Sequence, residues 1–274
     1  MTFIITLVSL VIERFFDWSH IRQWRWFMRY QAWLGMRFSA WSSYLILGFS
    51  VLPLVFIVAA INFFLTGVLF GVFKLLFGIL VVMYCMGPNN FWAQIYVCVT
   101  EMHKEDPRAA MEKIQEVFGV SLPTDAQAFH HAFTNAMFIE GNRRVFAVLF
   151  WFILLGPAGS VLYRLVDLCK AKGIAVTQAA EKADRLLDWL PVRAYTFFFA
   201  LAGHFTQVIR HWRMGFFAAP VANDALITQS GVAALDVLEA ERIPEDGTAE
   251  QETLSLLDRV FVIGLVVLAI VVLV

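Results

Sequence analysis

Charged residues and catalytic motifs are scarce in this sequence. Only 16% of its 274 residues are Asp, Glu, Lys or Arg, and the formal net charge is −1. A protein that binds nucleic acid needs clustered positive charge to neutralise phosphates, and no such cluster is present, so that class is excluded. The Walker A loop, the Gly-x-Ser-x-Gly elbow and the His-Glu-x-x-His motif are also absent, which removes three common signatures of an enzyme.

Cysteine is also rare, and its spacing excludes two kinds of site. Cys85, Cys98 and Cys169 form no Cys-x-x-Cys or Cys/His pattern, so neither a disulfide framework nor a zinc site is indicated. His130 and His131 are adjacent and would point about 100° apart on a helix. We therefore interpret both as surface or core histidines and predict no metal site.

Hydrophobic residues are what the sequence has in excess. They form 60% of the chain, and the mean hydropathy of +0.70 lies outside the range of ordinary soluble domains. Leu45 to Phe64 is a run of twenty residues without a formal charge, long enough at ~1.5 Å per residue to cross a hydrocarbon core of roughly 30 Å. Pro53 in this run frees a carbonyl that a neighbouring helix must satisfy.

Further apolar segments follow, and several are short or interrupted. Val68 to Met86 comes directly after Leu65-Thr66-Gly67, which predicts a tight hairpin, and Lys74 is expected to extend its charge toward the hairpin end rather than pair inside the bundle. Val145 to Val166 is interrupted at Gly156-Pro157-Ala158-Gly159, which predicts either a bent span or a re-entrant hairpin. We predict an all-α, polytopic membrane protein with four to six membrane segments, some short or broken, plus cytoplasmic helices.

The arginines near the N-terminus predict the orientation. Five arginines between Glu13 and Ser43 place this segment in the cytoplasm, and the hairpin brings Gly87 to Arg144 to the same side. A simple crossing at 145–166 would then put Lys170 and Arg185 outside. Broken or re-entrant segments at 145–166 and 194–212 would resolve this conflict, and a positively charged outside loop is the alternative. We expect a multi-pass protein of the bacterial inner membrane with its main soluble parts in the cytoplasm.

Five regions are predicted along the chain. They are N-terminal membrane segments with a basic loop and hairpin (1–86), a cytoplasmic helical region (87–144), broken or short membrane segments with connecting helices (145–212), a cytoplasmic region with an acidic linker (213–259) and a C-terminal anchor (260–274). Asp106-Pro107 and a capping box at Thr124 predict helix starts, and Gly119 and Gly141 predict helix ends. A long helix is expected from Ala222 to Arg242, and the linker follows at Ile243 to Thr248.

Two short collars of polar residues adjoin the apolar segments. In the first, Glu140, Asn142, Arg143 and Arg144 lie where the cytoplasmic helices meet the segment that begins at Val145. Paired arginines at such a place either anchor a helix at headgroup level or bind an anion, and anchoring is the favoured interpretation. The second collar is Asp188 to Arg193, where Trp189 suits the membrane interface and Pro191 is predicted to start the next helix.

These collars, in their order and spacing, resemble the AmpE family of inner-membrane proteins associated with β-lactamase induction. The residues that carry the resemblance are Ile12 to Phe15, Val148 to Trp151, Gly156 to Gly159, Tyr163-Arg164, Leu187 to Arg193 and Gly203-His204. The resemblance spans most of the chain, including the C-terminal segment. It implies a membrane regulator or sensor with a protein partner in cell-wall recycling signalling.

The same pieces are distantly similar to the CobD/CbiB enzymes, which condense an aminopropanol unit with a cobalamin precursor. Those enzymes carry an acidic run opposite Ile139 to Arg144 of this chain. Here one glutamate stands beside two arginines, and this reversed charge opposes a magnesium-nucleotide site. The resemblance thus implies a shared fold, and an enzymatic activity is not favoured.

Three functions stay open, and one set of residues is the candidate site for a ligand or partner. The favoured function is a non-enzymatic regulator that binds an anionic or nucleotide ligand or a protein; a membrane ligase of the CobD/CbiB type and a transporter are the alternatives. No catalytic residue and no cofactor is assigned, and the lipid bilayer is the expected surrounding. The candidate residues are Glu13, Glu140, Asn142, Arg143, Arg144, Tyr163, Arg164, Asp188, Arg193 and His204.

Overall fold

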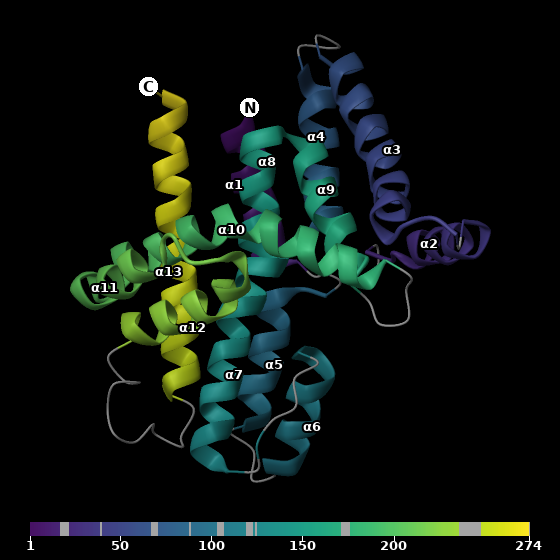
Figure 1. Cartoon of the computed structure of the whole chain (residues 1–274). Coiled ribbons are helices and arrows are strands. Elements are labelled where there is room, and N and C mark those ends of the chain that lie inside the picture. The colour runs from purple at the N-terminus through teal and green to yellow at the C-terminus, as the bar shows by residue number, and fades with distance from the viewer. Residues whose placement is uncertain are drawn as a thin grey trace. The chain divides into compact units, whose positions relative to one another are not determined.

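The computed structural model describes residues 1–16, 22–38, 40–66, 71–87, 89–102, 107–118, 123, 125–170, 176–235 and 248–273. Every regular element in these ranges is a helix (Figure 1), which confirms the predicted all-α class. The helices group into two compact units, each built from two separate stretches of chain. Unit 1 comprises residues 1–89 and 147–189, and unit 2 comprises residues 90–146 and 190–274.

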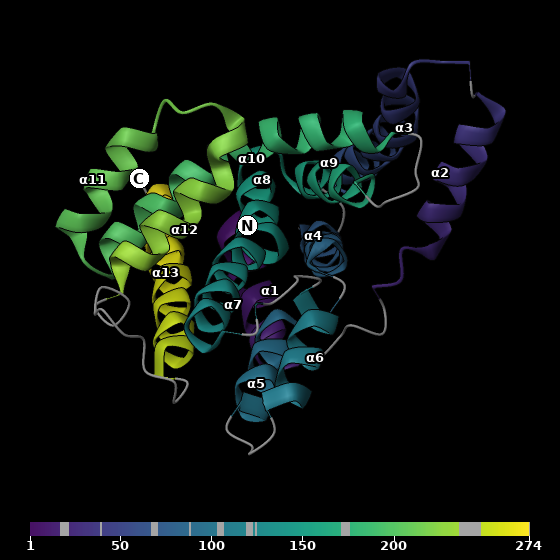
Figure 2. The same ribbon diagram turned by 60° about the horizontal axis from the view of Figure 1, so that its bottom comes forward.

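Unit 1 is a group of apolar helices around α9. Its helices are α1 (Thr2–Phe15), α2 (Arg25–Arg37), α3 (Ser43–Phe64), α4 (Val72–Cys85), α8 (Ala147–Leu155), α9 (Pro157–Leu168) and the first half of α10 (Thr177–Ala202). Helix α9 packs against α3, α4 and α8, and α1 packs against α4. The first half of α10 lies across α8 and α9 in both ribbon views (Figures 1 and 2).

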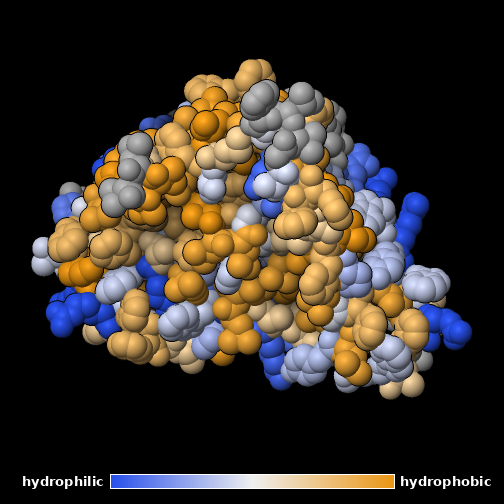
Figure 3. All heavy atoms as spheres, turned by 90° about the horizontal axis from the view of Figure 1, so that it is seen from above, coloured by the Kyte–Doolittle hydropathy of each residue, from blue (hydrophilic) through white to orange (hydrophobic). Residues whose placement is uncertain are grey.

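Two of the described helices are long and apolar enough to cross a membrane. Helix α3 has 22 residues and only 22% of its apolar stretch is buried, and α13 (Thr248–Leu273) is similar with 28%. Such exposed apolar surface needs a lipid surrounding, because contact between apolar side chains and water is unfavourable. Hydrophobic side chains also cover much of the face seen from above (Figure 3). The protein is therefore a polytopic helical membrane protein, as predicted.

The observed α13 begins earlier than the predicted anchor at 260. Its first turns carry Glu250, Glu252, Asp258 and Arg259, so the sequence is polar at one end of the helix and apolar at the other. The Glu250 carboxylate is fully buried and lies 2.7 Å from His130 Nδ1 of α7 (Ala126–Gly141), which confirms His130 as a core histidine. The polar first turn of α13 is thus packed against α7 through the buried pair of His130 and Glu250.

Proline 53 lies inside α3, and the carbonyl that it leaves without a donor has a partner. The Tyr30 hydroxyl of α2 donates a hydrogen bond of 3.2 Å to the Phe49 carbonyl, four residues before Pro53. The predicted rescue by a neighbouring helix is confirmed. Lys74, in the first turn of α4, donates from Nζ to the Thr66 hydroxyl at 3.3 Å, so its charge extends toward the hairpin end as predicted.

Helices α8 and α9 form a short hairpin whose chain reverses at Gly156. Gly156 has a φ of +68°, a conformation that favours glycine, and Pro157 opens α9. The Ser160 hydroxyl donates to the Val148 carbonyl at 3.0 Å, and a Cβ on Gly159 would lie 2.2 Å from the Trp151 carbonyl. Of the two predicted forms for this segment, the structure therefore has the hairpin. At ~1.5 Å per residue its helices are about 14 and 18 Å long, less than a bilayer core of roughly 30 Å.

Unit 2 is arranged around α7. Its other elements are α5 (Phe91–Met102), α6 (Pro107–Phe118), η3 (Asn142–Phe146), the second half of α10, α11 (Phe205–Gly215), η4 (Pro220–Ala222), α12 (Asn223–Ala234) and α13. Helix α7 packs against α5, α6, α12 and α13, and α11 packs against α12.

The prediction that Pro191 starts a helix is wrong. Helix α10 runs without interruption from Thr177 to Ala202 and contains Pro191. The carbonyl four residues earlier, that of Leu187, accepts a hydrogen bond of 3.2 Å from the Trp151 indole of α8. Because a tertiary contact supplies the donor that proline lacks, the helix continues.

Other predicted helix ends need correction as well. The helix expected over 222–242 ends at Ala234, because Leu235 has an extended backbone. Gly141 ends the α-helical geometry of α7 but not the helix, which continues as the π-helical η3. The predicted signals at Asp106, Gly119 and Thr124, and the linker at 243–247, lie outside the described residues. The observed N-cap of α7 is Asp125, whose carboxylate accepts from the Ala128 amide at 3.0 Å.

Candidate functional site

The ten candidate residues fall into two groups, one in each unit. Unit 1 contains Glu13, Tyr163, Arg164 and Asp188, and unit 2 contains Glu140, Asn142, Arg143, Arg144, Arg193 and His204. Each group includes buried charged side chains that form hydrogen bonds or ion pairs with other residues of the protein.

The first buried ion pair of unit 1 joins the end of α1 to the segment before α2. Arg22 donates to both carboxylate oxygens of Glu13, with 3.1 Å between Nη1 and Oε1, and to the Gly87 carbonyl at 3.0 Å. Each side chain of the pair is only 1% exposed. A buried pair of this kind is expensive to break, because the remaining charge has no compensation.

Arg164 of α9 completes a second contact with the end of α4. Its Nε donates to the Cys85 carbonyl at 2.5 Å, and its Nη1 lies 2.6 Å from Asp167 Oδ2. Carbonyls at a helix C-terminus lack intrahelical donors and carry partial negative charge. Arg22 and Arg164 therefore stabilise the same helix end, one at Gly87 and the other at Cys85.

The remaining polar residues of unit 1 join α9 to α10. The Tyr163 hydroxyl donates to Asp188 Oδ1 at 2.8 Å, and both side chains are buried. Lys170 forms ion pairs with Asp167 and Asp184 at 2.8 and 2.7 Å. We call the following set the unit 1 cluster: Glu13, Arg22, Tyr163, Arg164, Asp167, Lys170, Asp184 and Asp188.

In unit 2, the first collar coincides with the π-helical turn η3. We call Glu140, Asn142, Arg143 and Arg144 the arginine turn. A π-helical turn inserts one extra residue into a helix and is frequent at functional sites. Asn142 within it is fully buried, so this turn is part of the core of unit 2 and not a solvated loop.

The two adjacent arginines of this turn have different surroundings. Arg144 is buried; it contacts Glu140 and Gln94 at 2.5 Å each and donates to the Val117 carbonyl at 3.1 Å. Arg143 is 31% exposed and donates to both carboxylate oxygens of Asp224, at 3.0 and 3.2 Å, while Asp224 itself is 53% exposed. Arg144 is therefore a packing residue, whereas Arg143 makes a partly solvated contact.

Arg193 binds the chain between α11 and α12. Its guanidinium donates to the carbonyls of Gly215, Phe216 and Ala218 at 2.9 to 3.3 Å, and to Asn223 Oδ1 at 2.5 Å. The planar donor fork of arginine suits several acceptors at once. His204 is exposed at the N-cap position of α11 and makes no side-chain cap hydrogen bond there.

Several residues of these groups could not be identified from the sequence. Arg22 is one of the five arginines that predict the orientation in the membrane, and the sequence does not indicate its pairing with Glu13, nine positions away. Gln94, Asn223 and Asp224 come from helices distant in sequence and carry no local signal. Asp167 is the exception, because its i,i+3 spacing from Arg164 on a helix indicates a pair. Among the described residues, no group of three His, Cys, Asp or Glu could hold a metal ion.

Comparison with known families decides the classification. The model of the family described as "Regulatory signalling modulator protein AmpE" matches residues 1–274. The chain belongs to the AmpE family. This confirms the resemblance seen in the collars, and it makes the protein a member of a family of membrane regulatory proteins.

A weaker similarity links this AmpE-family chain to cobalamin biosynthesis proteins. It is 34% identical over 96 residues to the cobalamin biosynthesis protein CobD of Stutzerimonas stutzeri, covering 32% of each chain. With CobD of Chromobacterium violaceum it is 37% identical over 81 residues, covering 27% of this chain and 26% of the relative. The match thus spans about a third or less of these curated relatives. No solved structure matches the chain.

Proposed function

We propose that this protein is a non-enzymatic regulator of the bacterial inner membrane that modulates β-lactamase induction through cell-wall recycling signals. The observation that carries the proposal is the match of the regulatory AmpE family over the whole chain. The buried charges of unit 1 support it, because they pair with protein groups and hold helices together, as a structural framework requires.

Arg143 is the residue to which we assign binding of the signalling ligand or partner. Its contact with Asp224 is partly exposed on both sides, so an anionic ligand or an acidic partner side chain can replace Asp224 without breaking a buried pair. Arg144 next to it fixes the turn through Glu140 and Gln94. An exchange at Arg143 would thus act on a turn whose backbone is already held in place.

The test is β-lactamase induction in a strain that carries an inducible enzyme and lacks the chromosomal copy of this gene. The deletion should change the induced β-lactamase activity, and wild-type protein should restore it. Arg143→Ala should reach the membrane in equal amount but fail to restore this activity. Lys113→Ala is the matched control, since Lys113 also forms an exposed ion pair, with Glu116. Unchanged basal and induced activity in the deletion strain would overturn the proposal.

The proposed orientation places the segments 13–43 and 87–144 in the cytoplasm. Single-cysteine labelling can test this on the otherwise native chain, because Cys85, Cys98 and Cys169 are buried and burial raises the pKa of the Cys98 thiol to about 11. Ala32 and Gln115 are exposed, so Ala32→Cys and Gln115→Cys should both react only with a reagent that reaches the cytoplasm. Reaction of the two positions from opposite sides would exclude this arrangement.

A membrane ligase is the second candidate, and the regional similarity to CobD proteins favours it. The local charges oppose a ligase, since the Glu140 carboxylate lies 2.5 Å from Arg144 and 3.9 Å from Arg143. These arginines neutralise the carboxylate in place of a magnesium ion. Purified protein should therefore not condense a cobalamin precursor with magnesium and ATP. Steady turnover that Glu140→Gln abolishes would promote the ligase over the regulator.

A further inference from the structure

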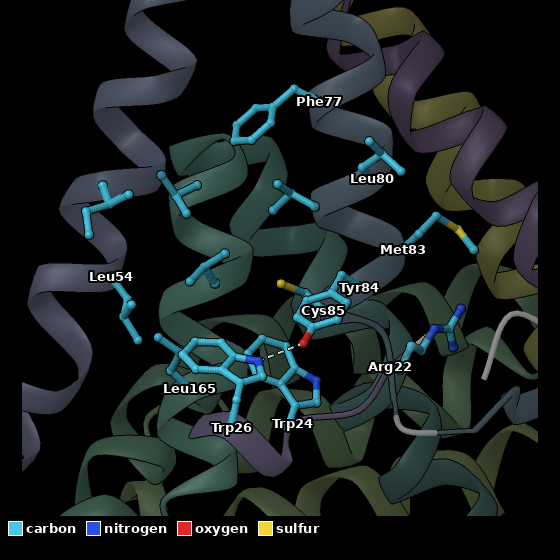
Figure 4. A pocket seen from close by; sticks show the side chains of 14 residues that line it. Arg22, Trp24, Trp26, Leu54, Phe77, Leu80, Met83, Tyr84, Cys85 and Leu165 are labelled. Carbon is cyan, nitrogen blue, oxygen red and sulfur yellow. Dashed lines mark hydrogen bonds between the residues drawn. The ribbon is translucent and has the colours of Figure 1, made fainter. Parts of the chain in front are cut away.

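Unit 1 contains an apolar cavity of about 410 Å³ between α3, α4 and α9. Leu54, Ile57 and Val58 of α3 form one wall, Phe77, Leu80 and Val81 lie along α4, and Val161 and Leu165 of α9 form the floor. Figure 4 shows Phe77 and Leu80 above a group of aromatic rings and Leu165 beside these rings. None of the ten candidate residues lines the cavity, and Arg22, the partner of Glu13, is the member of the unit 1 cluster that it shares.

The cavity is continuous with the surface that faces lipid. Ile57 and Leu80, which line it, are 54% and 63% exposed, and they belong to the apolar helices of unit 1. Water has no hydrogen-bond partner along such walls, whereas an alkyl chain that enters from the bilayer keeps its apolar surroundings.

The opposite end of the cavity is aromatic and offers unused donors. Trp24, Trp26 and Tyr84 gather there, while Arg22 lies to one side with its guanidinium directed away from the rings (Figure 4). Tryptophan and tyrosine favour the level of lipid headgroups. Trp26 donates to the Tyr84 hydroxyl at 3.0 Å. The buried Trp24 Nε1 and Arg22 Nε, in contrast, have no hydrogen-bond acceptor. Because a buried donor without an acceptor is costly, the Trp24 indole calls for an acceptor oxygen from outside the chain.

We propose that this cavity binds one acyl chain of a bilayer glycerolipid, with the lipid ester carbonyl directed to the donor at Trp24. The apolar walls take the chain, and the aromatic end takes the polar linkage. The positive charge of Arg22 is already matched by Glu13, so a neutral ester oxygen suits this end better than a second anion.

The experiment uses the full chain in nanodiscs of phosphatidylethanolamine and phosphatidylglycerol that include a lipid with a photoreactive diazirine in its acyl chain. After irradiation, cross-linked peptides are identified by mass spectrometry. In the wild-type protein, the cross-links should concentrate on 54–58 and 77–85 relative to 262–271 of α13, although 262–271 is the more exposed segment. An even distribution over all three segments would overturn the proposal without any variant.

Two substitutions sharpen the result. Val58→Trp fills the cavity from α3 and should reduce its cross-links several-fold, whereas Val55→Trp, one turn away on the same helix and outside the cavity lining, should not. Trp24→Phe keeps the ring but removes the donor, and should reduce the yield roughly threefold, the size of one neutral hydrogen bond. The exposed Trp33→Phe is its control. Unchanged yields in both Val58→Trp and Trp24→Phe would contradict the assigned occupant.

Discussion

Arg22 and Arg164 of unit 1 and Arg193 of unit 2 are buried arginines that have different kinds of partner. In unit 1, Arg22 and Arg164 pair with carboxylates and also close the carbonyl end of α4. In unit 2, Arg193 donates hydrogen bonds to backbone carbonyls and to an amide oxygen between α11 and α12. The first arrangement depends on charge, because removing one partner leaves another ion buried. The second depends on the shape of the guanidinium, because neutral acceptors only require donors in the right directions.

The largest effect is expected from Arg22→Met, which leaves the buried Glu13 carboxylate without its cation. We expect a loss of roughly 3–5 kcal/mol in the free energy of unfolding. Chemical or thermal unfolding in a mild detergent measures it. The matched control is Arg25→Met three residues later, where the side chain is exposed. Adding Glu13→Gln to Arg22→Met should recover part of the loss, and strict additivity would contradict a coupled pair.

The comparison becomes sharper when each arginine is replaced by lysine. Arg193→Lys keeps the charge but loses the fork that serves four acceptors, so we expect a cost of about 2–3 kcal/mol. Arg22→Lys keeps the cation beside Glu13 and should cost less. The unfolding measurement ranks the two variants, and a larger loss for Arg22→Lys would show that charge is not what distinguishes Arg22 from Arg193.

A smaller effect is expected at the proline of α10. Trp151→Phe removes the donor to the Leu187 carbonyl and should cost about 1–2 kcal/mol. Pro191→Ala restores a backbone amide that can bond this carbonyl, so the cost of Trp151→Phe should fall in that background. A double-mutant cycle measures the coupling, with the exposed Trp33→Phe as control. Equal costs in both backgrounds would exclude the rescue.

The smallest loss of stability is expected at Arg143. Because its contact with Asp224 is partly exposed, Arg143→Gln should cost no more than about 1 kcal/mol. The adjacent Arg144→Gln, at a buried site, should cost clearly more. Equal losses measured by thermal unfolding would remove the distinction between the structural and the exchangeable arginine of this turn.

The sequence predicted best where the signal is local. The uncharged run at 45–64 became α3 (Ser43–Phe64), and Gly156-Pro157 marked the reversal between α8 and α9, because length, charge and backbone preference act there within a few residues. Where two forms were compatible with the pattern, as at 145–166, only the contact between Ser160 and Val148 decides between them.

The failures occur where a distant side chain supplies what the local chain lacks. Pro191 was predicted to begin a helix, and the indole of Trp151, forty positions earlier in the chain, allows the helix to continue. Gln31, which lies in the segment expected to form a basic loop, is instead buried in α2 and donates to Ser50 at 2.7 Å. For the candidate site, the resemblance supplied Tyr163 and Asp188, but their contact across 25 positions follows only from the fold.

The reversal at Gly156 also bears on how the chain is inserted. In the orientation proposed above, a hairpin that returns to the side from which it starts would leave the basic residues that follow α9, such as Lys170 and Arg185, on that side during biogenesis. Each lysine or arginine moved to the hydrocarbon centre costs about 2.5–3.5 kcal/mol on an insertion scale. A pair of short helices can thus enter the membrane without translocating any charged loop, and the apex at Gly156 is uncharged.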